Sequence, residues 1–208
     1  MGCDGRASDL LCHPCFESLP WTGSAGCERC GLPAAFDTPV CGACKNVDFA
    51  FATARAPLRY EGVGKEIVHA LKYRGYTAVV DRLAAPLLAE LVEDPDAFEA
   101  VVPIPLHRAR LRRRGFNQAA LLAGGLAGRI NTPVSDTLKV VRSTRDQVEL
   151  SAAGRRRNVA GAFSAEARVR ERLLLVDDVL TTGATTSACA EALLDAAEVY
   201  AVTLCRTC

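Results

Sequence analysis

The sequence of 208 residues is poor in aromatic side chains, which make up 6% of it, and its formal net charge is only +1. A charge so close to zero does not by itself single out nucleic acid, a membrane surface or an acidic substrate as partner. The scarcity of aromatic residues also argues against extensive base stacking along a nucleic acid. Only local clusters of charge can therefore indicate a partner.

The sequence also lacks any apolar run as long as a membrane span, and its N-terminus lacks the basic and then apolar pattern of a signal peptide. Gly2 is a possible myristoylation position, but Arg6 stands where that motif needs Ser or Thr. We therefore expect a cytoplasmic protein that does not insert into a membrane.

Cysteine, by contrast, is abundant, and six of the ten cysteines form three C-x-x-C pairs within the first 44 residues. Clustered pairs favour a metal site over a framework of disulfides. Pro and Gly are frequent between the pairs, and so short a segment cannot bury enough apolar surface to fold unaided. Residues 1–46 are therefore predicted to form a small zinc ribbon, and residues 47–208 a larger domain.

The second and third pairs make the more convincing site, because Gly31 and Gly42 supply the turns of two metal-binding knuckles. Two such knuckles bring four thiolates to one tetrahedral Zn²⁺ of structural type. The predicted ligands are Cys27, Cys30, Cys41 and Cys44. A redox dithiol, or buried cysteines without metal, are the alternatives.

The first pair is half of a further site. Cys12 and Cys15 would be joined by Cys3, but Arg6 stands where the partner of Cys3 is expected. His13 or Asp4 would have to complete the metal coordination. A second zinc at this degenerate site is therefore a weaker prediction than the first.

From residue 49 onward, apolar strands alternate with amphipathic helices. This pattern is typical of an α/β domain with a mostly parallel sheet. We expect strands at 50–59, 100–104, 137–142, 173–176 and 199–204, and helices at 64–74, 81–92, 116–130 and from 184 to about 197.

The stretch 173–186, LLLVDDVLTTGATT, organises this domain. Its apolar strand ends at Asp177 and Asp178, and ligands of parallel sheets bind where such strands end. The loop around Gly183 can direct backbone N–H groups and hydroxyls at a phosphate, helped by the positive end of the next helix. The carboxylates then suit sugar hydroxyls and a hard cation such as Mg²⁺, which together describe a ribose 5-phosphate. An ordinary strand with an Asp-capped turn is the simpler alternative.

This stretch resembles the phosphoribosyl pyrophosphate (PRPP) motif of type I phosphoribosyltransferases. The glycine-rich dinucleotide fingerprint and the Walker A pattern are both absent. The resemblance implies PRPP contacts from Asp177, Asp178, Val179, Thr181, Thr182, Gly183, Ala184 and Thr185.

Five arginines lie within residues 108–114, directly after a predicted strand that ends near Pro105. Guanidinium groups bind pyrophosphate in a bidentate manner, so Pro105 is expected beside PRPP and Arg110 and Arg114 are candidate catalytic groups with the two aspartates. A solvated helix face is one alternative. The other is a nucleic-acid patch formed by Arg112, Arg113 and Arg114.

Two further features remain open. The polar stretch 142–158 is either disordered or a lid that closes over a substrate. Lys72 follows a predicted helix and either reaches the leaving pyrophosphate or interacts with the helix dipole.

The order of motifs along the chain resembles the ComF family. The resemblance rests on the cysteine pairs, Leu71-Lys72-Tyr73, Pro103-Ile104-Pro105-Leu106, Arg114-Gly115-Phe116-Asn117-Gln118, Gln147, Arg157-Asn158-Val159 and Asp177-Asp178. It implies a zinc ribbon joined to a phosphoribosyltransferase-like domain, with a role in DNA uptake during natural competence. The incomplete first cysteine pair departs from the pattern of two zinc sites.

Two functions follow from this resemblance. The favoured one is PRPP·Mg²⁺ binding, with phosphoribosyl transfer left open because a fold does not determine a reaction. The alternative is a non-catalytic competence factor that binds single-stranded DNA through the zinc ribbon and the arginine patches. No segment identifies an acceptor base, and the oligomeric state is not predicted.

Overall fold

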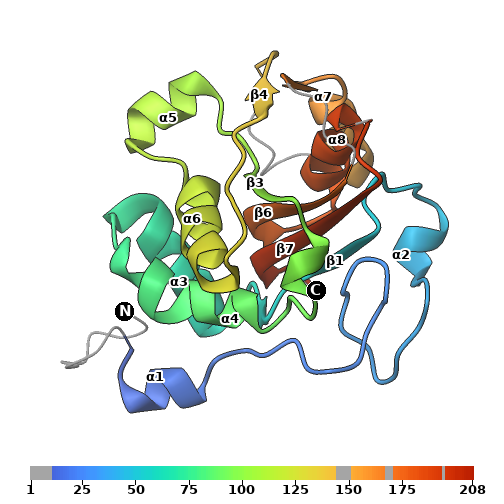
Figure 1. The fold of residues 1–208 in the computed structure, drawn as a ribbon. Coiled ribbons are helices and arrows are strands. Elements are labelled where there is room, and N and C mark those ends of the chain that lie inside the picture. Colours follow the sequence, from blue (N-terminus) through green and yellow to red (C-terminus); the bar gives the residue numbers. More distant parts are fainter. Residues whose placement is uncertain (1–10, 144–150, 167–170, 194) are drawn as a thin grey trace.

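The computed structural model describes residues 11–143, 151–166, 171–193 and 195–208. A five-stranded sheet lies at the centre, with β1, β7, β6 and β3 side by side (Figure 1). β2 pairs with the C-terminal end of β7. All pairings in the sheet are parallel, so the carboxyl ends of the strands meet at one edge. The predicted α/β fold is confirmed. The strands are β1 (Thr53–Arg55), β2 (Leu58–Arg59), β3 (Ala100–Pro103), β6 (Arg172–Leu180) and β7 (Glu198–Arg206).

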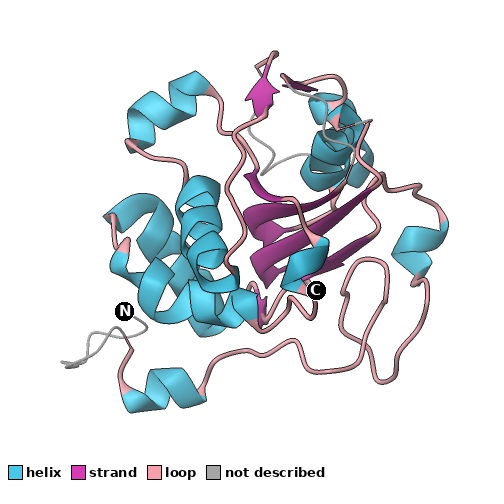
Figure 2. Ribbon diagram, viewed as in Figure 1, coloured by secondary structure: helices cyan, strands magenta, loops and turns pink. Residues whose placement is uncertain are grey.

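Helices cover both faces of this sheet (Figure 2). Successive residues of β6 point to opposite sides: Leu174 packs in a core with α3, α4 and α6, whereas Leu173 and Leu175 pack in a core with α8 and the cysteine-containing segment. Burial on both faces explains why β6 is a continuous apolar run. The remaining elements are α1 (His13–Glu17), α2 (Gly42–Lys45), α3 (Gly62–Arg74), η1 (Val80–Ala84), α4 (Ala85–Ala89), η2 (Pro95–Ala97), α5 (Arg108–Arg114), α6 (Gln118–Ile130), β4 (Leu138–Val140), α7 (Ala152–Val159), β5 (Phe163–Ala165) and α8 (Ala184–Ala192).

Proline accounts for two differences from the expected elements. The strand expected over 50–59 is split into β1 and β2, because Pro57 has no N–H for the ladder. The helix expected over 81–92 is a π-helical turn followed by α4, and Pro86 lies in the first turn of α4, where no N–H is needed. In addition, α8 ends at Ala192 and not near residue 197.

The strand expected over 137–142 was wrongly placed in the main sheet. Its residues form β4, which pairs antiparallel with β5 in a separate two-stranded sheet. Residues 152–158, predicted as part of a disordered loop or lid, belong to α7, which packs on α8 through Val159, Ala184 and Ala188. Residues 144–150 of that stretch lie outside the described residues.

The arginine run forms α5, a short helix that projects from the body of the protein (Figure 1). None of its residues is buried, and it ends at Gly115, whose φ of 87° suits glycine. α6 follows, and the Asn117 side chain caps it by accepting a hydrogen bond from the Ala119 N–H at 3.1 Å. In the part of the chain that the structure describes, no helix is both long and apolar enough to cross a bilayer.

Candidate metal centre and binding edge of the sheet

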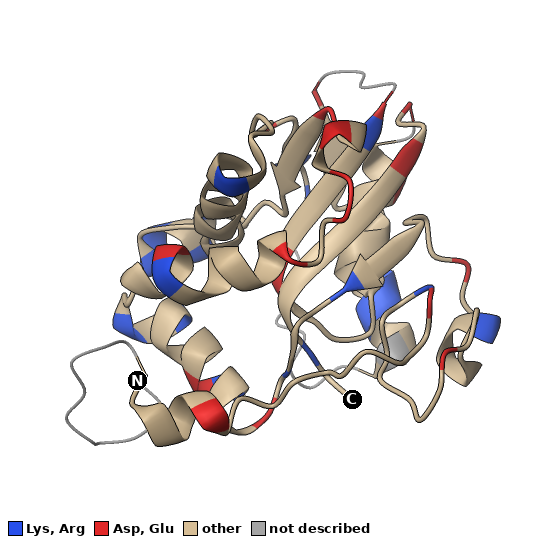
Figure 3. Cartoon of the chain, turned by 60° about the horizontal axis from the view of Figure 1, so that its bottom comes forward, with Lys and Arg blue, Asp and Glu red and all other residues tan. Residues whose placement is uncertain are grey.

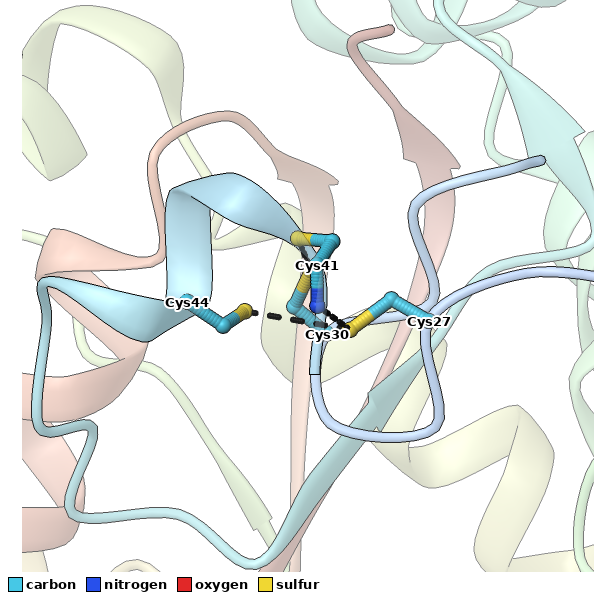
Figure 4. A group of neighbouring side chains, drawn as sticks. All are labelled: Cys27, Cys30, Cys41 and Cys44. Carbon is cyan, nitrogen blue, oxygen red and sulfur yellow. Dashed lines mark hydrogen bonds between the residues drawn. The ribbon is translucent and has the colours of Figure 1, made fainter. Parts of the chain in front are cut away.

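Four cysteine thiols converge in the N-terminal segment, as the sequence predicts (Figure 4). The Sγ atoms of Cys27 and Cys44 are 3.9 Å apart, and those of Cys30 and Cys41 are 3.8 Å apart. Zn–S bonds of about 2.3 Å place the sulfurs of a tetrahedral site about 3.8 Å from one another, whereas a disulfide needs about 2.05 Å. The cluster therefore has the spacing of a metal site and not of a disulfide.

Backbone amides also stabilise a thiolate in the cluster, which favours cation binding. The Cys41 N–H donates to Cys27 Sγ at 3.3 Å, as in a metal-binding knuckle. Burial acts to raise the pKa of Cys27, but backbone N–H groups of Cys30, Cys41 and Arg29 stabilise its thiolate and lower the pKa to about 7. A thiolate is the form that binds zinc.

A buried guanidinium gives an independent test of the metal prediction. Arg206, at the end of β7, is 6% exposed, and its Nη2 donates to Cys30 Sγ at 3.3 Å. Burial raises the pKa of Cys30, and the charge of Arg206 opposes that rise. A buried cation needs an anion beside it, and four thiolates around Zn²⁺ carry a net negative charge. The residues present therefore fit zinc. Sequence reasoning missed Arg206, although a lone arginine ending an apolar strand was a signal.

The first cysteine pair has a different setting. Cys15 is buried in α1 and Cys12 is partly exposed, while Cys3 lies outside the described residues. The His13 Nε2 lies 3.2 Å from Glu17 Oε1, and both side chains are well exposed. A second metal site there stays a prediction.

The two aspartates lie within β6 and not after it, because the strand continues to Leu180. The Asp178 carboxylate is buried and makes an ion pair with Lys72 Nζ of α3 at 2.7 Å. Asp177 is partly exposed, and its Oδ1 accepts the Asp178 N–H at 2.8 Å. Its negative charge raises the pKa of Cys189 in α8, in addition to the larger effect of burial. Adjacent carboxylates thus have different neighbours.

The electrostatics of this pair favour a cation. Burial and then the charge of Asp178 raise the pKa of Asp177 to about 7, against the opposing charges of Lys72 and Arg114. Burial acts to lower the pKa of Lys72, but the charge and hydrogen bond of Asp178 raise it above the ordinary value. Lys72 is therefore held as a cation against Asp178, and Asp177 would gain most from a further positive charge.

The hydroxyl loop (residues 181–183) connects β6 to α8. Gly183 has a φ of 73°, and a Cβ there would lie 2.8 Å from Cε1 of Phe49, so both the backbone and the space require glycine. Within the loop, Thr182 Oγ1 is buried without a hydrogen-bond partner. Val179 precedes the loop, and Ala184 and Thr185 begin α8.

Several buried donors have no partner among the described residues. Such groups are rare in proteins unless something absent satisfies them. They belong to different elements: Thr182 Oγ1 follows β6, Gln118 Nε2 begins α6, Arg59 Nε ends β2 and Arg206 Nε ends β7. Gln118 and Arg59 were not among the predicted site residues, although Gln118 closes the Arg-Gly-Phe-Asn-Gln motif.

The arginines of α5 divide into two groups. Arg114 lies over the ring of Tyr73, 5.4 Å from its centroid, and its charge acts on Asp177. Arg112 and Arg113 are exposed and Arg110 is partly exposed, while Pro105 lies in the loop after β3. Charges of both signs are otherwise interspersed over the chain (Figure 3). The structure therefore associates Arg114 with the carboxylates and leaves Arg112 and Arg113 facing solvent.

Comparison with known proteins identifies relatives along nearly the whole chain. The DNA utilization protein YhgH of Salmonella typhimurium is 36% identical over 209 residues, which cover 95% of this chain and 90% of the relative. The competence protein F of Haemophilus influenzae is 32% identical over 193 residues, covering 86% and 82%. The chain belongs to the ComF family.

A more distant relative of the same kind is competence protein ComFC of Bacillus subtilis, 27% identical over 97% of this chain and 86% of that protein. No family model matches the chain. The solved structure of Leishmania donovani UMP synthase aligns with 65% of this chain and 22% of its own, at 18% identity and a TM-score of 0.34. That TM-score is too low to carry an argument.

Proposed function

We propose that this protein binds PRPP together with Mg²⁺ at the carboxyl edge of its sheet, holds a structural zinc at the four cysteines, and acts in DNA uptake. The observation that carries PRPP binding is the buried, unpartnered hydroxyl of Thr182, placed between two carboxylates and the positive end of α8. A phosphate oxygen would satisfy that donor. The relatives named for DNA utilization and competence support the role in DNA uptake.

The hydroxyl loop, the two aspartates and Lys72 each have a role in this proposal. The loop and first turn of α8 receive the 5-phosphate through backbone N–H groups and the hydroxyls of Thr181, Thr182 and Thr185. Asp177 and Asp178 accept hydrogen bonds from the ribose hydroxyls. Lys72 neutralises Asp178 and fixes its position, a more specific role than the predicted contact with the leaving group.

The donor set also suits Mg²⁺. Two neighbouring carboxylates supply the hard oxygen ligands that this cation prefers, and the charge of Asp178 adds to the larger effect of burial in raising the pKa of Asp177. Bound Mg²⁺ would neutralise phosphate charge. If transfer occurs, Arg114, with Arg110, would stabilise the charge that develops on departing pyrophosphate.

A second candidate function is binding of single-stranded DNA on α5. A specific observation favours it: the helix has no buried residue and carries Arg108, Arg110, Arg112, Arg113 and Arg114 without an acidic residue. Beside it, Tyr73 is 69% exposed and offers a face for one base. This surface is compatible with PRPP binding at the adjacent edge.

Titration calorimetry with PRPP and Mg²⁺ tests the main proposal. Asp177→Asn combined with Asp178→Asn keeps the side-chain shape but removes both charges, so PRPP affinity should fall by more than about tenfold, since hydrogen bonds to charged groups contribute about 1.5–3 kcal/mol each. Asp96→Asn, an exposed carboxylate in η2, is the matched control and should bind as the wild type does. Equal affinity of the double variant and wild type would mean that the pair is structural. Acceptor-dependent release of pyrophosphate would show transfer.

A further inference from the structure

The segment that follows the cysteine cluster lies directly against the hydroxyl loop. Five residues after Cys44, Phe49 stacks on Phe51 with ring centroids 4.7 Å apart, in the same core as Cys27, Cys30 and Cys44. The Arg29 guanidinium, from within the first knuckle, donates a hydrogen bond to the Phe49 carbonyl oxygen. Both knuckles thus contribute to the position of Phe49.

Phe49 and Ala50 contact the hydroxyl loop and the first turn of α8. The Phe49 ring edge occupies the space that a side chain at Gly183 would need. Next to it, the Ala50 N–H donates to Ser187 Oγ at 3.0 Å, and the Ser187 N–H donates to the Gly183 carbonyl oxygen at 2.8 Å. These contacts hold the end of the loop and the first turn of α8.

The cluster reaches the start of the loop by a second route. Arg206 bonds to Cys30, and the next residue, Thr207, donates its N–H to the Leu180 carbonyl oxygen at 3.0 Å. Leu180 is the residue directly before the loop. Residues that touch the cysteine cluster, or adjoin one that does, therefore support the loop at both ends.

We infer that the four-cysteine metal site and the hydroxyl loop form one coupled unit, in which bound zinc positions the loop for a phosphate group and a bound phosphate group helps to retain zinc. The positioning residues are Phe49, Ser187 and Arg206, none of which needs to touch the ligand. Coupling between two sites is reciprocal, so each ligand must strengthen the binding of the other by the same factor. Regarding the ligand, this inference rests on the proposed PRPP function.

Hydrogen exchange of the full chain, with and without zinc, tests whether zinc positions the loop. This experiment needs no PRPP. Zinc removal should increase amide exchange over residues 181–187, because the loop loses its support, and leave α6 protected. Unchanged protection at 181–187 would overturn the inference. An equal increase in α6 would overturn it as well, since zinc would then support the whole fold and not this loop.

The equilibrium distribution of zinc between the protein and a zinc-selective chelator, in Mg²⁺ with and without PRPP, tests whether PRPP strengthens zinc binding. Saturating PRPP should tighten zinc binding to the wild type by about five- to tenfold, at the lower end of usual couplings. Ser187→Ala and Phe49→Leu should reduce this effect. The control Thr22→Ala removes a different bond between the N-terminal segment and the domain, to the Ala56 carbonyl oxygen at 2.9 Å, and should behave as wild type.

The outcomes separate the two proposals. PRPP that binds the wild type but does not tighten zinc binding would overturn the coupling and leave the proposed function intact. PRPP that does not bind zinc-loaded protein would overturn the proposed function, and the exchange of residues 181–187 would then decide the coupling alone.

Discussion

The four cysteines come from residues 27–44, whereas the groups at the carboxyl edge come from separate strands and helices between Arg59 and Arg206. In the first region, short-range turns bring the thiols together. In the second, a parallel sheet places the ends of β2, β3, β6 and β7 at one edge, and packing of α3 then brings Lys72 to Asp178. A site built from neighbouring residues can be found from spacing, but the partners within a site built from distant ones depend on the register and packing of the fold.

The two regions also differ in charge. Arg206 provides a buried positive charge beside the cysteines, and Asp177 and Asp178 concentrate negative charge at the edge, with Lys72 paired to only one of them. Arg206 suits the net negative charge that four thiolates around Zn²⁺ would carry, whereas the two aspartates would bind a cation directly. Substitutions at the cysteines should therefore change the zinc content, and substitutions at the aspartates should change the pH dependence of stability.

The largest effect is expected at the cysteines. Cys30→Ser should reduce zinc from about one ion per chain to near zero and destabilise the N-terminal segment by several kcal/mol, because binding of structural zinc is also folding free energy. Elemental analysis of protein purified without added metal measures it. Cys208→Ser, an exposed cysteine, is the control and should retain zinc. Wild type with no zinc and a folded N-terminal segment would contradict the prediction, and about two ions per chain would support the further site at Cys3, Cys12 and Cys15.

An intermediate effect is expected at Asp177, with a size that depends on pH. Its pKa of about 7 in the folded protein lies above the ordinary value near 3.8, so protonation favours folding. The stabilisation is complete below about pH 4 and is lost as the pH rises through 7. Asp177→Asn should therefore raise the free energy of unfolding relative to wild type by about 1–3 kcal/mol at pH 8 and by much less at pH 4.

Urea unfolding of the ligand-free protein at the two pH values measures this change. Asp96→Asn should keep the pH dependence of the wild type, because its carboxylate is exposed. If the stability difference between Asp177→Asn and wild type were the same at both pH values, Asp177 would not titrate abnormally, and the contrast in charge between the regions would be weaker than the structure indicates.

The smallest effect is expected on α5. Changing Arg112, Arg113 and Arg114 together to Gln should weaken single-stranded DNA binding several-fold and reduce the dependence of affinity on salt, since each phosphate contact releases counterions. Lys65→Gln with Lys139→Gln removes exposed positive charge outside both α5 and the cysteine segment and serves as control. The aspartate double variant should leave DNA affinity intact. DNA affinity that falls with the aspartates and not with the arginines would place DNA at the carboxyl edge and remove the distinction between the two surfaces.

The sequence by itself determined the fold class, the family and the convergence of four thiols. Continuous apolar strands alternating with helices can pack in few ways, and C-x-x-C turns need only local geometry. The same local logic failed for residues 137–142, which are apolar enough for a strand but whose partner, β5, could not be read from spacing. It also ended β6 too early, because backbone pairing with β7 extends the strand through both aspartates.

Only the tertiary structure decided which groups meet. Because successive side chains of β6 point to opposite faces of the sheet, Asp178 pairs with Lys72 and Asp177 lies on the α8 side, although the two residues are adjacent in sequence. The tertiary structure also placed Arg114, but not Arg112 or Arg113, where the charge of the side chain acts on Asp177. It also brought Arg206 to Cys30 and Phe49 to Gly183, contacts between segments far apart in the chain. Such contacts arise from the register of parallel strands and from packing across the two cores, which no local pattern of residues encodes.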